Sequence, residues 1–301
     1  MSEYYTPPRL ANLDLPLGKR VRLQRLLYKY GPGNGKLLVL PIDQGIEHGP
    51  VDFFSNPDAK HPRYQYELAK QGGYSAIALH YGLASKYLRD YAGEVPLILK
   101  LNGRTNVPGE TEPFSPLTSG VEDAVRLGAD AVGYTLYVGS PRQAEEIAQF
   151  SEVRSACDHY GMPLVMWGYP RGSAIEAKGG RDSFYAIDYA ARLGEELGAD
   201  IVKINLPKFS AKDGDSPKPY DTLGSDLGLE GAFRQCVESA GKCMVLVSGG
   251  SRVGDDDLLE KVRLSMRAGA TGLIFGRNFW QRPMKEALAI TEKVREIIAA
   301  S

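Results

Sequence analysis

One lysine lies inside an otherwise apolar segment, where a charged side chain is unusual. Lys203 falls in the sequence Ala-Asp-Ile-Val-Lys-Ile-Asn-Leu, residues 199–206. If this segment is a strand, successive side chains alternate between its faces, and the face opposite Lys203 is entirely aliphatic. Lys203 then points into the protein, where burial lowers a lysine pKa and favours the neutral amine. A neutral amine can attack a carbonyl carbon to form a Schiff base. Alternatively, Lys203 is a structural lysine that pairs with an inward carboxylate. Lys100 is a second inward lysine and therefore a rival nucleophile.

An aromatic pair ends the apolar segment that precedes the lysine segment. Trp167 and Tyr169 are two residues apart and therefore share a face. A tyrosine at this position could exchange a proton with a substrate hydroxyl or carbon. The alternative is an aromatic pair that closes the mouth of the core. Gly168 between them and the run Pro-Arg-Gly at 170–172 favour a shaped surface that includes Arg171.

A carboxylate ends the first apolar segment. Asp43 shares a face with the alternate residues of 37–41, so we expect it to point inward. It could pair with Lys203 or handle a proton on a substrate hydroxyl. It could equally cap the turn around Gly45, a common role for Asp before Gly. Glu47 and His48 on the same loop are weaker candidates.

Glycines follow the last two apolar segments. The first run is Val-Ser-Gly-Gly-Ser-Arg at 247–252, and the second is Ile-Phe-Gly-Arg-Asn at 274–278. Glycines let backbone N–H groups approach a phosphate closely, and an arginine adds a bidentate fork. Turn glycines beside a surface arginine are the plainer interpretation. Because both runs occur where phosphate sites recur in barrels, we predict phosphate binding. The glycines of these runs are Gly249, Gly250 and Gly276, with Ser248 before the first two and Arg277 after the third.

The sequence predicts neither a metal site nor a cofactor. Its four histidines are scattered and lack the spacing of metal ligands. A lysine imine would stabilise a carbanion without a metal.

The elements that must position these side chains follow an alternating order. Short, β-rich, nearly continuous apolar segments suit parallel strands covered on both faces. They occupy residues 37–43, 74–81, 96–102, 131–138, 163–169, 201–206, 244–248 and 272–276, and amphipathic helical patterns occupy 65–71, 120–127, 141–160, 183–197, 229–240 and 255–268. A Ser-Pro pair at 140–141 predicts the start of the third of these helices. Eight β-then-α units predict an α/β fold, a single (β/α)8 TIM barrel. The rival doubly wound sheet lacks its Gly-x-Gly-x-x-Gly fingerprint after the first strand.

The chain divides into an extension and a barrel. Residues 1–36 are rich in Pro and Arg and form the predicted N-terminal extension, and residues 37–301 form the barrel domain. Two long loops, 103–119 and 207–226, follow predicted strands. They should therefore lie on the carboxyl face of the barrel, where active sites occur.

Composition limits the partners of the protein. The 301 residues carry 36 Lys+Arg against 37 Asp+Glu, with no basic block that would indicate nucleic acid or an anionic membrane. Three cysteines without C-x-x-C spacing fit a reducing cytoplasm. The first residues lack a secretory pattern, and no apolar run approaches the ~18 residues of a membrane span. We expect a cytoplasmic protein.

The combined motifs resemble those of the DhnA-type (archaeal-type) class I fructose-bisphosphate aldolases. The resemblance covers about residues 37–280 and rests on the strand-one Asp-x-Gly, the Trp-Gly-Tyr-Pro-Arg-Gly segment, the strand-six lysine and the two glycine runs. It implies reversible cleavage of fructose 1,6-bisphosphate to dihydroxyacetone phosphate and glyceraldehyde 3-phosphate. It also implies roles for particular residues: Lys203 in the Schiff base, Tyr169 in proton transfer, Asp43 as the strand-one aspartate, Trp167 in shaping the pocket, and the two glycine runs in binding phosphate. Arg171, Ser173 and Lys178 are positional candidates for a second phosphate.

Other functions fit the same residues. Relatives on this scaffold include aminodideoxyheptulosonate synthase-like transaldolases and phosphosugar thiolases, and a non-catalytic sugar-phosphate-binding barrel is a further alternative. By analogy with the family we expect a homo-oligomer. Phe279 and Trp280 are the aromatic side chains that we expect to be exposed for such an interface.

Overall fold

Parallel strands close into a barrel at the centre of the molecule. The structure, a computed structural model, describes residues 4–109 and 112–301. Among these residues eight strands follow one another around the barrel in chain order, and β8 pairs with β1. The strands are β1 (Leu37–Pro41), β2 (Ala76–His80), β3 (Leu97–Lys100), β4 (Ala131–Val138), β5 (Leu164–Pro170), β6 (Ile201–Ile204), β7 (Met244–Ser248) and β8 (Gly272–Ile274). The predicted (β/α)8 barrel is confirmed.

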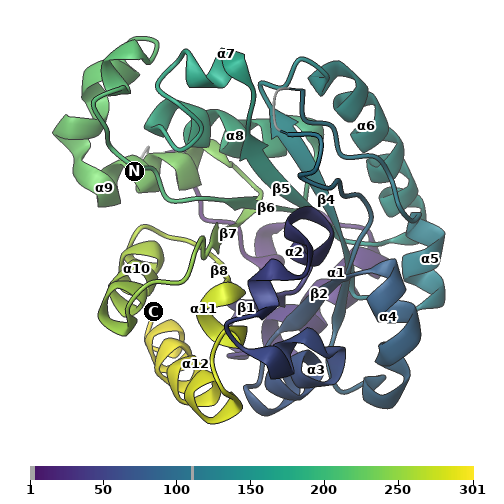
Figure 1. Ribbon diagram of the computed structural model, residues 1–301. Coiled ribbons are helices and arrows are strands. Elements are labelled where there is room, and N and C mark those ends of the chain that lie inside the picture. The colour runs from purple at the N-terminus through teal and green to yellow at the C-terminus, as the bar shows by residue number, and fades with distance from the viewer. Residues whose placement is uncertain (1–3, 110–111) are drawn as a thin grey trace.

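Helices surround the barrel on all sides (Figure 1). They are α1 (Leu17–Gln24), α2 (Gln44–His48), α3 (Pro62–Gln71), α4 (Tyr81–Tyr87), α5 (Val121–Arg126), α6 (Gln143–Tyr160), α7 (Ser173–Glu176), α8 (Phe184–Leu197), α9 (Tyr220–Ser239), α10 (Asp255–Arg267), α11 (Arg277–Trp280) and α12 (Met284–Ala299). All six predicted helical segments are helical, with shifted ends.

Two of the shifted boundaries have a physical reason in the structure. Helix α6 begins at Gln143 rather than at Pro141, because the Ser140 hydroxyl donates to the Pro113 carbonyl, and a turn precedes the helix. The second long loop ends at Pro219 rather than at residue 226. Its last residues form the first part of α9, which a kink at Gly228 (φ 65°) separates from the predicted part. The glycines of this stretch concealed its helical character in the sequence.

Phe279 and Trp280 are buried, contrary to the expectation that they form an exposed surface. Each side chain is 0% exposed. The Trp280 indole donates to the Pro41 carbonyl at 3.2 Å and stacks on Phe53, 5.0 Å between ring centroids. These contacts fix the short helix α11 against the end of β1.

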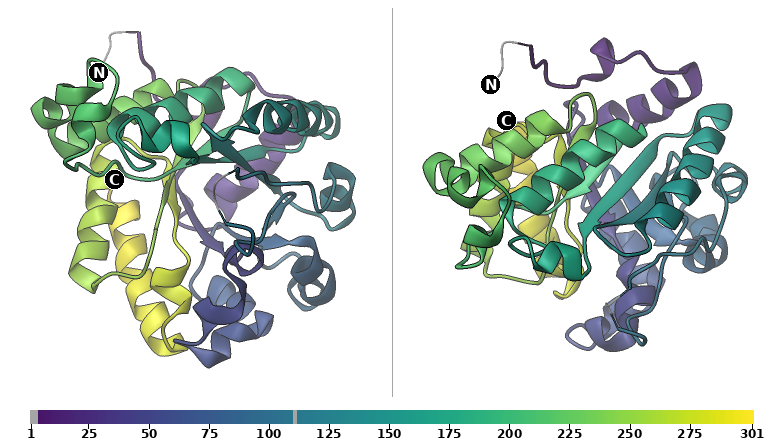
Figure 2. Two further views of the ribbon diagram at one scale, coloured as in Figure 1. Left: turned by 45° about the horizontal axis from the view of Figure 1, so that its top comes forward. Right: turned by 90° about the horizontal axis from the view of Figure 1, so that it is seen from above.

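The N-terminal segment closes the amino end of the barrel. In the right-hand view of Figure 2 the N-terminal segment, in purple, runs across that end along the top of the picture. Leu23, Leu26 and Leu27 are at most 1% exposed and pack in one cluster with inward side chains such as Val39. Three ion pairs tie the segment to the barrel: Lys19 with Asp158 and Asp200 at 2.8 and 2.9 Å, and Arg25 with Asp130 at 2.7 Å. The segment therefore supplies part of the core on the side opposite the predicted site.

In the ranges 4–109 and 112–301, no helix combines the length and the apolar character that a membrane crossing requires.

Two leucines of α1 test the contribution of this segment to stability. Leu23 is 0% exposed and Leu17 is 76% exposed. We expect Leu23→Ala to lower the free energy of unfolding by about 2–5 kcal/mol because it opens a cavity in the barrel floor. Leu17→Ala on the same helix should change it by less than about 0.5 kcal/mol. Urea unfolding of both variants measures the difference, and equal small effects would show that the segment is not part of the barrel core.

Candidate active site

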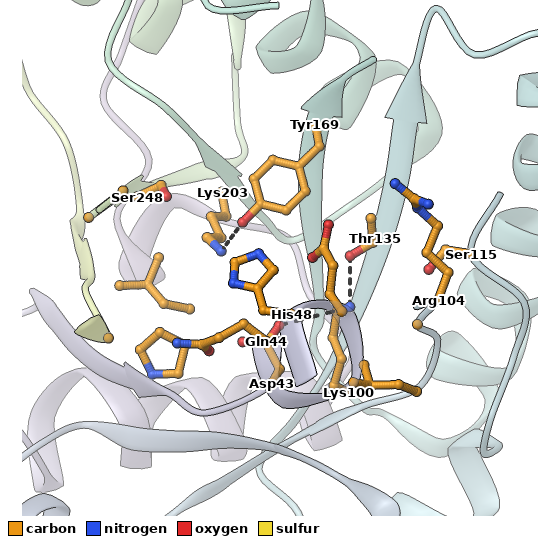
Figure 3. A pocket seen from close by; sticks show the side chains of 18 of the residues that line it. Asp43, Gln44, His48, Lys100, Arg104, Ser115, Thr135, Tyr169, Lys203 and Ser248 are labelled. Atoms are coloured by element: carbon orange, nitrogen blue, oxygen red, sulfur yellow. Dashed lines mark hydrogen bonds and ion pairs between the residues drawn. The ribbon is translucent and has the colours of Figure 1, made fainter. Parts of the chain in front are cut away.

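A cavity at the carboxyl ends of the strands brings together nine of the ten predicted site residues. Its lining includes Asp43, Tyr169, Arg171, Lys203, Ser248, Gly249, Gly250, Gly276 and Arg277. Trp167 lies one layer deeper, and the residues lining the cavity do not include Ser173 or Lys178. Figure 3 shows side chains from several strands pointing into this space. Alternation along each strand explains the convergence, because inward residues at the upper end of a barrel face its mouth.

Lys203 and Tyr169 form the centre of the site. Lys203 is 5% exposed, and in the described part of the chain its Nζ makes one hydrogen bond, to the Tyr169 hydroxyl (Figure 3). Burial lowers the pKa of Lys203 to about 8, against the opposing effects of Asp43 and Glu47. Burial also raises the pKa of Tyr169, and the same two carboxylates raise it further. The site therefore holds an amine that is partly neutral near neutral pH beside a phenol that keeps its proton.

Trp167 forms the floor beneath two lysines. The indole is 0% exposed, and its ring centroid lies 5.1 Å from Lys203 Nζ and 5.3 Å from Lys100 Nζ. Gly133 on β4 makes this position possible, because a Cβ there would come within 2.5 Å of the indole and 3.0 Å of the Lys100 side chain. The aromatic face stabilises either ammonium and excludes water from below.

Lys100 differs from Lys203 in its hydrogen bonds. Lys100 Nζ donates to the Asn102 carbonyl at 3.0 Å and to Thr135 Oγ1 at 2.7 Å, and it lies 4.0 Å from Asp43 Oδ2. Burial lowers its pKa to about 8 as well, so the pKa does not distinguish the two lysines. Their contacts distinguish the two lysines. The hydrogen bonds of Lys100 occupy its donors and hold its nitrogen in place, whereas the Lys203 amine faces the cavity.

Asp43 occupies the N-cap position of α2, but its side chain makes no capping hydrogen bond. The carboxylate instead lines the cavity beside Lys100. The backbone carbonyl of Asp43 accepts a hydrogen bond from His80 Nε2 at 3.0 Å, which helps to fix the turn after β1. Burial, together with the charge of Lys100, lowers the pKa of His80 to about 4, so this imidazole is neutral. The geometry favours a chemical role for Asp43 over the capping role.

The weaker candidates on this loop also lie at the cavity. Glu47 and His48 both line the cavity. His48 Nδ1 pairs with Asp52 Oδ2 at 2.7 Å, and the same carboxylate oxygen lies 3.9 Å from Arg277 Nη1. His48 therefore belongs to a small polar network with Asp52 and Arg277.

The two glycine runs meet on one wall of the cavity. A Cβ at Gly249 would lie 3.0 Å from the Phe275 ring, and a Cβ at Gly276 would lie 2.8 Å from the Pro41 carbonyl. Only glycine fits at either position without a shift of its neighbours. The absence of side chains leaves the backbone of this wall accessible to a ligand, with Arg277 beside it.

Sequence reasoning missed several polar residues of the lining. They are His80, Arg104, Ser115, Thr135, Tyr137 and Asn205. The alternation that identified Lys203 also places Asn205, Thr135 and His80 inward at strand ends. Arg104 and Ser115 belong to the predicted loop 103–119, part of which, residues 110–111, lies outside the described residues. Within the described ranges, no group of three or more His, Cys, Asp or Glu residues could hold a metal ion.

Comparisons with known proteins agree with this site. The model of the DeoC/LacD family aldolases matches residues 37–282. A fructose-bisphosphate aldolase class 1 from Thermoproteus tenax is 39% identical over 265 residues, which are 88% of this chain and 90% of the relative.

Two solved structures extend the similarity to the backbone. An archaeal fructose-1,6-bisphosphate aldolase, with its catalytic lysine covalently bound to the carbinolamine intermediate of the substrate, is 36% identical with a TM-score of 0.77, over 92% of this chain and 99% of that one. A fructose-bisphosphate aldolase from Slackia heliotrinireducens is 26% identical with a TM-score of 0.82, over 98% and 92% of the two chains.

The predicted family is thus confirmed by sequence and by structure. The chain belongs to the DeoC/LacD family of aldolases and, within it, to the archaeal-type class I fructose-bisphosphate aldolases.

Proposed function

We propose that this protein is a class I fructose-bisphosphate aldolase whose imine forms on Lys203. It cleaves fructose 1,6-bisphosphate reversibly to dihydroxyacetone phosphate and glyceraldehyde 3-phosphate. One observation carries the assignment of the site: the Lys203 amine lies buried at the floor of a cavity, bonded to the Tyr169 hydroxyl and facing a wall of glycine backbone. The relatives reported above are named as fructose-bisphosphate aldolases, which favours this reaction over the transaldolase, thiolase and non-catalytic alternatives.

Imine formation begins with the neutral Lys203 amine. The nitrogen attacks the C2 carbonyl of the substrate to give a carbinolamine, which loses water to give an iminium ion. Burial supplies the neutral amine near neutral pH. Trp167 beneath the nitrogen stabilises the positive charge of the iminium ion that replaces the ammonium.

Carbon–carbon cleavage follows from the charge of the iminium ion. As the C4 hydroxyl loses its proton, the C3–C4 bond breaks, glyceraldehyde 3-phosphate leaves, and the electron pair moves to the iminium nitrogen to form an enamine. Tyr169 then donates its proton to C3 of the enamine, and water releases dihydroxyacetone phosphate and regenerates Lys203. Asp43 lies on the same cavity and handles the protons of the iminium or the hydroxyl.

The phosphates orient the substrate above the lysine. We assign one phosphate to the wall formed by Ser248, Gly249, Gly250, Gly276 and Arg277. Arg171 lies on the cavity beside Tyr169 and is our candidate for the second phosphate. Ser173 and Lys178 do not line the cavity, so they lose their positional support.

We also propose that the protein acts as a homo-oligomer in the cytoplasm, with residues 37–301 as the barrel domain and residues 1–36 as its extension. Exposed apolar side chains support an interface: Leu17 and Val21 on α1 are each more than half exposed, and so are Val51 and Phe54 after α2.

Borohydride trapping tests the imine. Reduction in the presence of dihydroxyacetone phosphate should leave a covalent adduct on Lys203, located by mass spectrometry of peptides. Lys203→Met should give no adduct, whereas Lys100→Met should still give one on Lys203. An adduct on Lys100 in the unmodified chain would move the site to the rival lysine. A folded protein that binds the ketone without an adduct would overturn the imine and favour the non-catalytic binder.

Tyr169→Phe separates imine formation from turnover. The variant keeps the ring over the site but loses the proton donor, so we expect kcat to fall by about 10²–10⁴-fold while the Lys203 adduct still forms. Steady-state cleavage assays and borohydride trapping of the same preparation measure the two effects. Unchanged kcat would exclude Tyr169 as the proton donor.

The pH dependence of the reaction reports the buried amine. Because only the neutral amine attacks, kcat/KM should rise with pH and level off above about 8, where Lys203 is mostly neutral. An ordinary lysine, with a pKa of about 10.4, would give a rise that continues well beyond pH 9. A coupled assay from about pH 6 to about pH 10 distinguishes the two profiles, and a continued rise would contradict the lowered pKa.

A further inference from the structure

Lys261 lies behind the phosphate-binding wall, on the side away from the cavity. It belongs to α10 and, with Asp257 and Glu260, lines a groove that adjoins the catalytic cavity. Gly250 lines both the groove and the cavity, whereas Lys261 lines the groove but not the cavity. Its Nζ donates a hydrogen bond to the Gly249 carbonyl at 3.1 Å and lies 5.5 Å from the centroid of the Phe275 ring. A lysine thus holds one backbone atom of the wall from behind.

The direction of this carbonyl determines the direction of the next N–H group. The Gly249–Gly250 peptide is trans, so its C=O and N–H point in opposite directions. With the carbonyl turned toward Lys261, the Gly250 N–H points to the cavity that both glycines line. In the described part of the chain this N–H has no hydrogen-bond acceptor, whereas the Gly249 N–H donates to the Ile274 carbonyl at 3.3 Å. The peptide therefore presents one free donor to a ligand.

Two adjacent glycines leave this peptide free to rotate unless something holds it. Gly250 has a φ of 70°, and glycine crosses between regions of backbone space at little cost. A flipped peptide would turn the Gly249 carbonyl into the cavity, where its partial negative charge would repel a phosphate. Asn278 Nδ2 also reaches this carbonyl, but at 3.4 Å. Lys261 makes the shorter of the two hydrogen bonds. Burial lowers its pKa to about 8, so most of this lysine is still protonated at neutral pH, and charged donors form the stronger hydrogen bonds.

We propose that Lys261 is a positioning residue for phosphate recognition: by holding the Gly249 carbonyl away from the cavity, it keeps the Gly250 N–H directed at the phosphate group of the substrate. Lys261 does not touch the substrate and acts through the peptide. The proposal rests on the proposed function, since it assigns the glycine wall to a substrate phosphate. It predicts that Lys261 matters only for phosphorylated ketones.

Lys261→Met tests the proposal with two ketones in the same preparation. Methionine keeps most of the side-chain length and removes the donor. The concentration of dihydroxyacetone phosphate that gives half-maximal borohydride trapping on Lys203 should rise by about 10–100-fold. This range corresponds to the free energy that a hydrogen bond from a charged donor contributes. The corresponding concentration of dihydroxyacetone, which has no phosphate, should not change. In cleavage assays the change should fall on KM rather than on kcat.

The dihydroxyacetone arm also shows that the variant is folded with a working Lys203. Lys285→Met, on the exposed face of α12, is the matched control for the loss of one positive charge and should resemble the unmodified protein with both ketones. Equal weakening for the two ketones would overturn the proposal in favour of a general structural role, and no weakening for either would show that the carbonyl needs no support from Lys261. Failure of the unmodified protein to trap either ketone would instead overturn the proposed function.

Discussion

Burial of the Lys203 amine is the constraint on which the proposed chemistry of this protein depends. A lysine in water is almost entirely protonated at neutral pH and is a poor nucleophile. The barrel interior lowers the pKa of Lys203 to about 8, at a cost on the order of 3 kcal/mol of folding free energy below that pH. This cost falls away as the pH rises toward the ordinary lysine pKa, because the folded and unfolded states then both hold a neutral amine. The rest of the fold must supply enough stability to hold the lysine in this position.

Closure of the barrel at its amino end makes such burial possible. Leu23, Leu26 and Leu27 fill the floor below the inward strand residues. The ion pairs of Lys19 and Arg25 hold the segment against the starts of β4 and β6. Trp167 forms the layer above and separates this apolar floor from the two ammonium groups. The interior thus changes from aliphatic to aromatic to polar along the barrel axis, and only the last layer meets the cavity.

The two lysines illustrate how contacts rather than residue type assign a role. Both are buried, both have lowered pKa values, and both lie over the same indole. Lys100 is held by Thr135, by a backbone carbonyl and by the nearby Asp43, so its nitrogen is fixed in place. Lys203 bonds the Tyr169 hydroxyl and faces the open space. A nucleophile needs a free approach to its substrate, which Lys203 alone of the pair provides.

The amino-acid sequence by itself determined the periodic features of this protein. Alternation along an apolar segment places Lys203, Tyr169 and Asp43 on inward faces, and eight such segments with helices between them specify the barrel. Both are local patterns that depend only on the geometry of a strand. The tertiary structure alone decided which inward residues meet. The register that pairs Trp167 with Lys203 brings the Tyr169 hydroxyl to the amine, and strand order places Thr135 and Asp43 around Lys100. The burial of Trp280 under Phe53 and the helical start of α9 at Tyr220 also arise from contacts distant in sequence. Such contacts depend on how strands and loops pack in space, and no single segment encodes them.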